Sequence, residues 1–423
     1  MNFLGWIEKR FYPELLVLVL AFIPSSYVML SAAGSLFYDV LRYAACVWIL
    51  AFYMKQIDKR SVPWYVLVAA FFLFWGAVTL LAGRTTLALS AAKSAIFAFC
   101  LVRIVDFYAD ADYINTISTV RLAFEILFWI NFCTVILFPG GLYQVSNDAN
   151  PTDVSRGFFL GHENNAIEYI IPLIGLSMLE SSLRKDRLDL HVLVLILASM
   201  VVVMMTWSAN AIVCVSAFLV FYFVAETPFS RFFRWSYFLG ASVGATLLLA
   251  VFQLQEKFAW FIVNVLKKNM TLSKRTVIWG KSIPWILKRP ITGYGLELPA
   301  ERFAKINAVN SCHNYYLDLL YNGGIVLLAI YVAMLVMCVT RISQVADRRG
   351  RAIASTVFGV YSILWIATPL HRGTVVIMFV IWMLLSKLPE LNLITGLRNA
   401  GTLTVRINNS GDEGRGLAAE RKG

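Results

Sequence analysis

Apolar residues form long runs along this chain, and short polar segments separate the runs. A hydropathy window of about 19 residues predicts roughly twelve membrane-spanning helices. The predicted spans cover Tyr12 to Leu30, Leu36 to Phe52, Trp64 to Leu81, Leu87 to Val105, Val120 to Leu137, Asn165 to Leu179, Val192 to Thr206, Ala211 to Phe223, Tyr237 to Val251, Tyr316 to Val339, Ile353 to Pro369 and Thr374 to Leu388. Almost no loop joins the seventh and eighth spans, so we expect a tight hairpin around Trp207 to Asn210. The pattern predicts an all-α, polytopic integral membrane protein.

Composition agrees with a lipid environment for most of the chain. Of the 423 residues, 59% are hydrophobic and 15% are charged, and the mean hydropathy is +0.70. These values are too apolar for a water-soluble protein of this length. The six cysteines stand singly, without the spacing of a metal or redox site, and we interpret them as core residues. The first apolar run lacks the pattern of a cleavable signal peptide and is expected to be the first transmembrane helix.

Basic residues in the short loops predict the orientation, because such loops stay in the cytoplasm. If about twelve helices alternate, four basic groups fall on one side: Lys55, Lys59 and Arg60; Arg184, Lys185 and Arg187; Arg231 and Arg234; and Arg341, Arg348, Arg349 and Arg351. Both termini are then cytoplasmic. The expected organisation is nine helices in residues 1–255, with a shorter outer loop at 139–164; a long outer loop at 256–314; three helices in 315–389; and a disordered cytoplasmic tail at 390–423.

The long outer loop is strongly basic. Between Glu256 and Asn314 it carries ten lysines and arginines against three glutamates. Basic residues are usually enriched in cytoplasmic loops, so their number in an outer loop is unusual, although this preference weakens for loops of roughly 60 residues. A single basic residue at a membrane surface usually contacts lipid headgroups. The cluster as a whole therefore indicates an anionic ligand, most simply a phosphate.

Two segments of this loop interleave aromatic residues with cations. The segment Glu256 to Lys267 is typical of a helix lying in the membrane interface, and Lys274 to Ile286 suits a membrane-surface segment. Gly293 and Gly295 predict a flexible turn, which by itself is weak support for phosphate binding. His313 stands where the next span begins, as either a site residue or a helix-capping residue, and Asn314 is a reasonable N-cap.

The shorter outer loop ends in a dense polar run before the sixth span. It contains Arg156, Gly157, Gly161, His162, Glu163 and Asn164. Such a run is also found in ordinary helix capping. It brings a carboxylate, an imidazole and an arginine to the same side as the basic loop, so we expect the two loops to meet.

Several short motifs in this order resemble the O-antigen polymerase and ligase superfamily. They are Arg275-x-x-x-Trp279, Pro290-Ile-Thr-Gly293-Tyr-Gly295, His313-Asn314-x-x-Leu317, Gly323-Gly324, Arg156-Gly157 and His162-x-Asn164. Each motif is weak alone, but their order and the position of the long loop between spans nine and ten make the resemblance fairly specific. It covers most of the chain.

The resemblance implies a metal-independent glycosyltransferase without a cofactor, at the outer face of the bacterial inner membrane. Its substrate would be an undecaprenyl-diphosphate-linked glycan; membrane lipid and other polysaccharide-export proteins are further expected partners, and nucleic acid is not. The implied catalytic residues are Arg275, His313 and Glu163. Arg156, Lys274, Lys281, Arg372 and Arg302 would bind the diphosphate, and Asn314, His162, Asn164, Trp279, Tyr294, Gly293 and Gly295 would position the sugar or the loop.

One departure from the family pattern bears on the reaction. Many members carry a Ser-Arg pair in the hairpin between spans seven and eight, especially the ligases of lipid A core, whereas this chain reads Thr206-Trp207-Ser208-Ala209-Asn210. The missing arginine favours a polymerase of O-antigen, capsule or exopolysaccharide repeats over a ligase. The alternatives are an O-antigen ligase, a flippase of lipid-linked glycan, and a non-catalytic scaffold of an export assembly.

Overall fold

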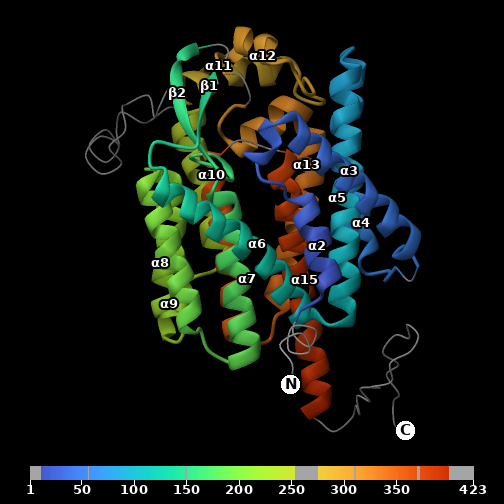
Figure 1. Ribbon diagram of the computed structural model, residues 1–423, viewed down its shortest axis with the longest axis vertical. Helices are drawn as coiled ribbons and strands as arrows, with labels where there is room; N and C mark the ends of the chain where they lie inside the picture. Colours follow the sequence, from blue (N-terminus) through green and yellow to red (C-terminus); the bar gives the residue numbers. More distant parts are fainter. Residues whose placement is uncertain are drawn as a thin grey trace.

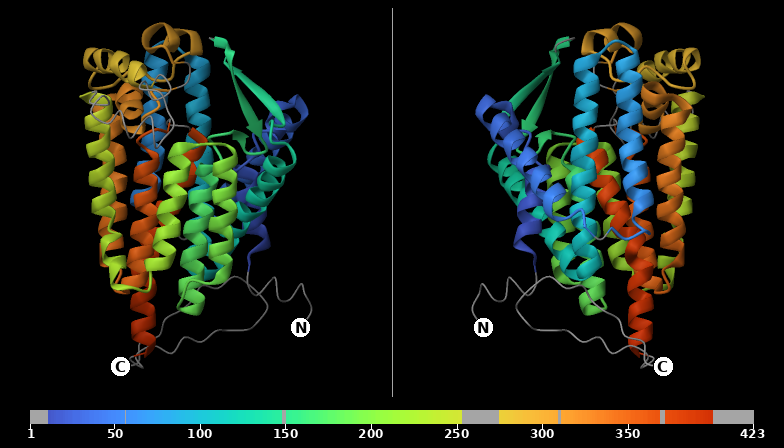
Figure 2. Two further views of the ribbon diagram at one scale, coloured as in Figure 1. Left: turned by 90° about the vertical axis from the view of Figure 1, so that its left-hand side faces the viewer. Right: turned by 90° about the vertical axis from the view of Figure 1, so that its right-hand side faces the viewer.

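The structure of the protein is a computed structural model that describes residues 11–55, 57–147, 150–252, 275–308, 311–368 and 372–399. Long helices lie side by side along the longest axis, and Figures 1 and 2 show a small sheet and the helices α11 and α12 gathered at one end. The helix α15 ends at the opposite end (Figure 1). Segments far apart in the sequence therefore meet at the end where the two outer loops are expected.

The elements follow one another with short connections. The first part of the chain contains α2 (Pro13–Phe22), the 3-10 helix η1 (Val28–Leu30), α3 (Ala32–Phe52), α4 (Val62–Leu81), α5 (Thr85–Ala111) and α6 (Tyr113–Leu137). After the sheet come α7 (Ile167–Lys185), α8 (Leu190–Met205), α9 (Ala209–Val224), the 3-10 helix η2 (Pro228–Phe232), α10 (Trp235–Thr246) and the π-helical turn η3 (Leu247–Val251). The last part contains α11 (Arg275–Lys288), α12 (Pro299–Ile306), α13 (Tyr315–Gln344), α14 (Arg348–Leu364) and α15 (Arg372–Asn399).

The helices have the apolar character of a membrane protein. Among the described residues, six helices are long and apolar enough to cross a membrane, and four shorter helices are also apolar. Large apolar side chains lie on the outside of the bundle, as in Leu81 (88% exposed), Leu36 (66%) and Phe223 (65%). Contact of such an apolar surface with lipid is favourable, whereas its contact with water is unfavourable. The membrane assignment follows from these helices, while the number of about twelve spans and the loop between spans nine and ten stay predictions.

Two local expectations can be compared directly with the structure. The tight hairpin is confirmed, because α8 ends at Met205, α9 begins at Ala209, and Trp207 turns the chain with a positive φ of 51°. The last helix, α15, continues to Asn399, past the predicted end of the last span at Leu388. Residues 400–423, which hold most of the predicted disordered tail, lie outside the described residues.

An aromatic core supports the end of the bundle that carries the outer loops. Trp365, at the end of α14, and Trp382, in α15, are buried with their ring centroids 5.6 Å apart. Tyr331 of α13 packs against both rings. The backbone N–H of Tyr315 donates to the carbonyl of Trp365 at 3.0 Å. The start of α13, which follows His313, is thereby fixed to the turn between α14 and α15.

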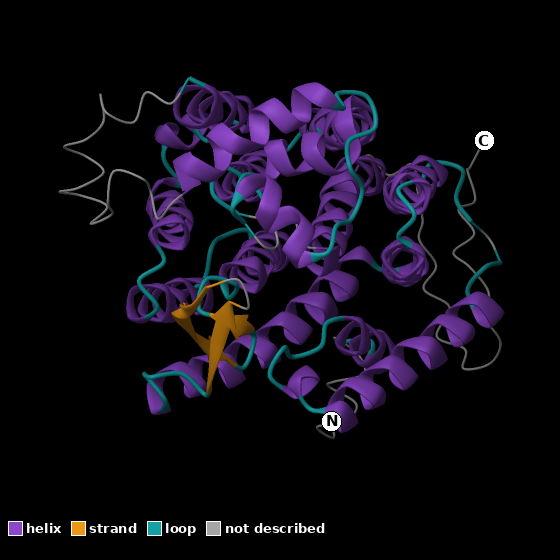
Figure 3. Ribbon diagram, turned by 90° about the horizontal axis from the view of Figure 1, so that it is seen from above, coloured by secondary structure: helices purple, strands orange, loops and turns teal. Residues whose placement is uncertain are grey.

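The expectation of an all-α fold missed a three-stranded antiparallel sheet in the shorter outer loop. It consists of β1 (Tyr143–Asn147), β2 (Asn150–Phe158) and β3 (Gly161–His162), in that order. Figure 3 shows the strands over the helix bundle. Gly157 pairs with Tyr143, whose ring covers it so closely that a Cβ at Gly157 would lie 2.3 Å from Cζ. Backbone hydrogen bonds and this close approach stabilise the sheet. The segment lacks the alternation of apolar and polar residues that predicts a strand, so the sequence pattern does not indicate the sheet.

The described part of the basic loop forms two helices, α11 and α12. The predicted surface segment Lys274 to Ile286 corresponds mostly to α11, and its Trp279 points into the protein instead of lying at the surface, with 1% of its area exposed. The predicted interfacial helix, Glu256 to Lys267, and the residue Lys274 lie outside the described residues. A 14-residue helix with a buried tryptophan indicates that this loop packs on the bundle.

A break in α13 explains the glycine motifs. Gly324 interrupts the helix with φ 60° and ψ −158°. The segment after α11 pairs with this break: the N–H of Tyr294 donates to the carbonyl of Tyr321 at 2.9 Å, and Gly295 donates to Asn322 at 2.8 Å. A Cβ at Gly293 would lie 2.5 Å from the carbonyl oxygen of Tyr321. These glycines allow two backbones to approach closely, so their structural role is to dock the loop onto α13.

We expect Gly324→Ala to destabilise the protein by about 3 kcal/mol or more, because alanine combines an unfavourable positive φ with overpacking. A Cβ at this position would lie 2.2 Å from the carbonyl oxygen of Ile291. Thermal unfolding of the detergent-purified protein measures the effect. Gly240→Ala in α10 is the matched control, because a Cβ there meets nothing within 4 Å. An unchanged midpoint for Gly324→Ala would contradict the docking role.

Candidate active site

Arg156, on β2, connects the sheet to the turn between α8 and α9. Its Nε donates to Oε2 of Glu163 at 2.8 Å, and Nη1 donates to the carbonyl of Pro139 at 3.0 Å. Nη2 lies 3.4 and 3.5 Å from the carbonyls of Met205 and Thr206 at the end of α8. Carbonyls at a helix C-terminus lack partners within the helix and attract cations. About a third of the Arg156 side chain (36%) remains exposed, so a ligand can still reach it.

His162 and Asn164 form a local turn beside this ion pair. The N–H of Asn164 donates to Nδ1 of His162 at 3.1 Å. Because Nδ1 accepts this bond, a neutral imidazole carries its proton on Nε2. The backbone N–H of Glu163 donates to the carbonyl of Arg156 at 2.9 Å. The structure therefore brings together the four polar residues that the shorter loop predicted.

Two asparagine amides connect the outer ends of α9, α10, α13 and α14. Nδ2 of Asn314 donates to Oγ1 of Thr246 at 3.1 Å and to the carbonyl of Ile366 at 3.0 Å. Its Oδ1 accepts from the N–H of Leu317 at 3.1 Å, which makes Asn314 the N-cap of α13, as predicted. Nδ2 of Asn210 donates to the carbonyl of Leu364 at 3.0 Å. Both amides therefore hold the turn between α14 and α15.

Asn210 stands near the place where the family pattern has an arginine. In this chain its amide contacts the backbone after α14, and Arg156 supplies the guanidinium on the other side of the α8–α9 turn. The sequence located the departure from the family pattern. It did not show the contacts of Asn210 and Thr246, because they join residues far apart in the chain.

Arg275 is the first residue of α11, and its side chain is partly buried. Burial lowers the pKa of Arg275 below its usual range. Within the part of the chain that the structure describes, Arg275 has no hydrogen-bond or ion-pair partner. A desolvated cation without a counterion binds an anion favourably, because the negative charge of the anion offsets the hydration that the cation has lost.

One hydrogen bond links the helix of Arg275 to the segment of His313. Nε1 of Trp279 donates to the carbonyl of Cys312 at 2.9 Å. Trp279 lies one helical turn after Arg275, and Cys312 immediately precedes His313. The bond therefore positions the two predicted catalytic residues on adjoining segments. Trp279 therefore positions the loop, and its ring is buried in this structure.

His313 is held in a left-handed backbone conformation with φ 52°. Its N–H donates to Oγ of Ser311 at 3.1 Å, and the neighbouring N–H of Cys312 donates to the buried carboxylate of Asp318 at 2.7 Å. The residue is only partly buried. A positive φ is uncommon for a histidine and indicates that the surrounding contacts dictate its position.

Arg302, a predicted diphosphate-binding residue, lies inside the loop. It is 4% exposed on α12, where its Nη2 donates to Oδ1 of Asn322 and its Nε lies 3.7 Å from Glu297. The side chain of Glu297 is fully buried and also contacts Lys305 and Arg84. These cations compensate a carboxylate inside the loop, so Arg302 stabilises the loop and is left out of the proposed diphosphate site.

We expect Glu297→Gln to lower the free energy of unfolding by about 3 kcal/mol, because it leaves buried cations without their carboxylate. The change also weakens the hydrogen bond from the Tyr321 hydroxyl, which now lies 2.8 Å from Oε2. Thermal unfolding measures the loss. Glu301→Gln is the control, because Glu301 bonds Arg84 at 2.8 Å from a side chain that is 41% exposed. Equal effects of the two variants would argue against the network.

The remaining predicted residues divide into three groups. Tyr294 packs against Tyr321, and its hydroxyl donates to the carbonyl of Trp285 at 3.0 Å, so it positions the loop. Lys281 is exposed on α11. Arg372 begins α15, but its side chain, like Lys274, lies outside the described part of the structure. Among the described residues, no group of three or more His, Cys, Asp or Glu side chains is arranged to hold a metal ion.

The family model for O-antigen ligase matches residues 192–332, the part of the chain that contains Arg275 and His313. The match supports the predicted membership of the O-antigen polymerase and ligase superfamily. No curated protein matches the chain in sequence.

The region that matches the family model extends from α8 into α13. It contains Asn210, Arg275, His313 and Asn314, while Arg156 and Glu163 come from the loop that precedes it. Members of this family are membrane enzymes of the glycosyltransferase type, and they act on lipid-linked glycans.

Proposed function

We propose that the protein polymerises lipid-linked polysaccharide repeat units by glycosyl transfer from an undecaprenyl-diphosphate donor at the outer face of the bacterial inner membrane. The main support is the uncompensated guanidinium of Arg275, which the Trp279 to Cys312 hydrogen bond fixes beside the segment of His313. The family match covers both residues. The remaining support is the ion pair of Arg156 and Glu163, which belongs to the outer loops at the same end of the bundle.

In the proposed reaction, an acceptor hydroxyl attacks the anomeric carbon of the donor glycan. The bond between that carbon and the diphosphate oxygen breaks, and undecaprenyl diphosphate leaves with the bonding electron pair. Arg275, with Arg156, Lys281 and Arg372 as further cations, stabilises the growing negative charge. Because protein cations supply this stabilisation, the proposal requires no metal ion.

His313 is the proposed general base, which orients the acceptor hydroxyl and takes its proton. Glu163 is the alternative base. Its carboxylate is already paired with Nε of Arg156, so it is less free to contact an acceptor hydroxyl. His162 and Asn164 would shape the acceptor side of the site, and Asn314 would hold the helix that follows His313.

The choice of a polymerase over a ligase rests on Asn210. In this chain the amide of Asn210 bonds the turn after α14, at a hairpin where many ligases of the family carry an arginine. Deletion of the gene followed by glycan analysis tests the choice. A polymerase predicts that single-repeat, lipid-linked units accumulate; full-length, unattached polymer would instead identify a ligase.

A flippase is the competing function of a different class. Reconstitution of the purified protein in proteoliposomes with the lipid-linked glycan on one side separates the two functions. Glycan chains should lengthen in these vesicles if the protein is an enzyme. Movement of lipid-linked glycan across the bilayer without any lengthening would overturn the enzymatic proposal.

A further inference from the structure

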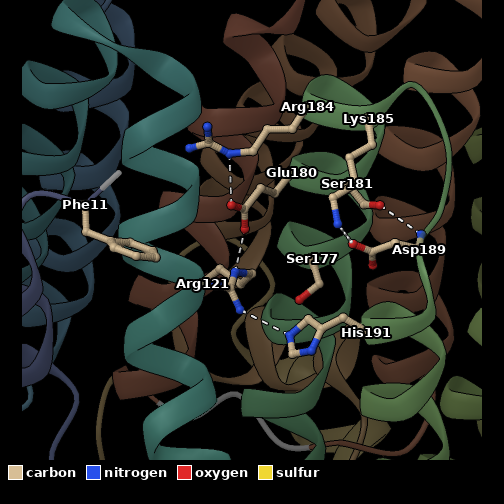
Figure 4. Close-up of a pocket in the computed structure, with 9 residues that line it drawn as sticks. All are labelled: Phe11, Arg121, Ser177, Glu180, Ser181, Arg184, Lys185, Asp189 and His191. Carbon is tan, nitrogen blue, oxygen red and sulfur yellow. Dashed lines mark hydrogen bonds and ion pairs between the residues drawn. The ribbon is translucent and has the colours of Figure 1, made fainter. Parts of the chain in front are cut away.

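A cavity lined by several charged residues lies at the opposite end of the bundle from the candidate active site. It has a volume of about 240 Å³ and lies between α6, α7, the start of α8 and the segment before α2. Figure 4 shows its lining side chains, with Glu180 between Arg121 and Arg184: Phe11, Arg121, Ser177, Glu180, Ser181, Arg184, Lys185, Asp189 and His191. The predicted orientation places this end in the cytoplasm. Its size is slightly below the range of about 300–1,000 Å³ that is usual for small-ligand sites.

The carboxylates of the cavity are already engaged by its cations. Glu180 lies 2.6 Å from Nε of Arg121 and 3.1 Å from Nε of Arg184, and it also accepts from Oγ of Ser118 at 2.6 Å. Lys185 pairs with Asp189 at 2.5 Å. This lysine and the N–H of Val192 lower the pKa of Asp189 despite its partial burial, so its charge is retained at neutral pH. No carboxylate of the lining is left to neutralise a further cation.

Two guanidinium groups nevertheless keep unused donors. Arg121 forms an ion pair from Nε to Glu180 without a hydrogen bond, and its Nη1 contacts Glu125 and His191. Arg184 uses Nε for Glu180 and Nη2 for Asn115 and Ser118. In the described part of the chain, Nη2 of Arg121 and Nη1 of Arg184 donate no hydrogen bond. The side chain of Arg121 is only 10% exposed, so water reaches it poorly. Unused guanidinium donors in the lining of a cavity suit an oxyanion.

We propose that this cavity binds the phosphate group of an anionic ligand from the cytoplasmic side. Arg121 and Arg184 would donate to the phosphate oxygens, and His191, whose side chain is 47% exposed, lies at the accessible edge. A phosphate carried by an inner-leaflet lipid and a free phosphate share this chemistry. Basic pockets between membrane helices on the cytoplasmic side are suited to lipid headgroups. The site is separate from the proposed glycosyl transfer and does not depend on it.

The test compares two probes on the full-length protein purified in detergent. Native mass spectrometry measures retention of phosphatidylglycerol, and thermal unfolding measures the response to inorganic phosphate. Arg184→Gln should weaken binding about tenfold, the loss expected for one charge-assisted hydrogen bond. Arg187→Gln is the matched control, because it removes a cation from the same α7–α8 turn outside the cavity lining. Lipid retention that depends on Arg184 identifies a headgroup site, and a phosphate response that depends on Arg184 identifies a free anion.

A second variant keeps the test decisive if Arg184→Gln fails to fold. Ser177→Leu extends an apolar side chain into the cavity and leaves every charge in place, since Oγ of Ser177 bonds only the carbonyl of Leu173 in its own helix. It should abolish the same binding signal. Arg275→Ala should leave it unchanged, which separates this site from the outer one. Binding of both probes that is equal in the wild type and these cavity variants would overturn the proposal.

Discussion

Arg275→Ala is expected to lower the rate of glycan transfer about 100- to 1,000-fold, the usual cost of removing one preorganised group that stabilises developing negative charge. The guanidinium is desolvated and has no counterion among the described residues, so its charge is available to the substrate. The loss should fall on kcat more than on KM, because the diphosphate gains most of its charge as the sugar bond breaks. Transfer from a lipid-linked glycan donor by the purified protein measures it.

The folded state should survive the loss of Arg275, because alanine removes a desolvated charge without breaking an ion pair. Lys288→Ala is the matched control. Lys288 lies at the other end of α11, exposed, with its ammonium 4.2 Å from the centre of the Trp285 ring. Inorganic diphosphate should raise the thermal midpoint of the wild type and of Lys288→Ala, but not that of Arg275→Ala. Comparable rates in the two variants would remove Arg275 from the mechanism.

His313→Asn is expected to lower kcat about 100- to 10,000-fold, the range that general-base catalysis usually contributes. Asparagine is the informative substitution because it tolerates the positive φ of 52° at this position. It removes the imidazole and keeps the backbone conformation. Single-turnover transfer measurements with saturating donor separate the chemical step from donor binding.

A structural role for His313 makes a different prediction. If the imidazole only supported the start of α13, His313→Asn would lower the thermal midpoint as well as the rate. Ser311→Ala removes the side chain that accepts the N–H of His313 at 3.1 Å and leaves the imidazole in place. The base assignment requires Ser311→Ala to keep most of its activity. Nearly full activity of His313→Asn would shift attention to Glu163.

The sequence anticipated much of the candidate site because the motifs are local. His162, Glu163 and Asn164 lie within three residues, and their contacts with one another and with Arg156 join near neighbours in the chain. The same holds for Asn314 as the N-cap of α13. Local geometry follows from residue type and spacing, which is why these predictions could be made without a fold.

The roles within the basic loop could not be assigned in this way. Ten cations in one outer loop look alike in sequence. Folding separates them, because Arg302 and Lys305 compensate the buried Glu297, whereas Arg275 has no carboxylate partner among the described residues. Whether a cation is neutralised depends on contacts across the fold, and charge counts do not contain that information.

The sequence by itself determined the apolar helices, the lipid environment, the tight hairpin at Trp207 and the family resemblance of the basic outer loop. Periodicity and composition are sufficient for these, because they reflect the solvent around each segment. Only the tertiary structure decided that the shorter loop forms a sheet, that Trp279 holds α11 beside His313, and that the glycine motif docks on the break in α13. Each of these depends on backbone hydrogen bonds and burial between residues distant in the chain, which no local pattern specifies.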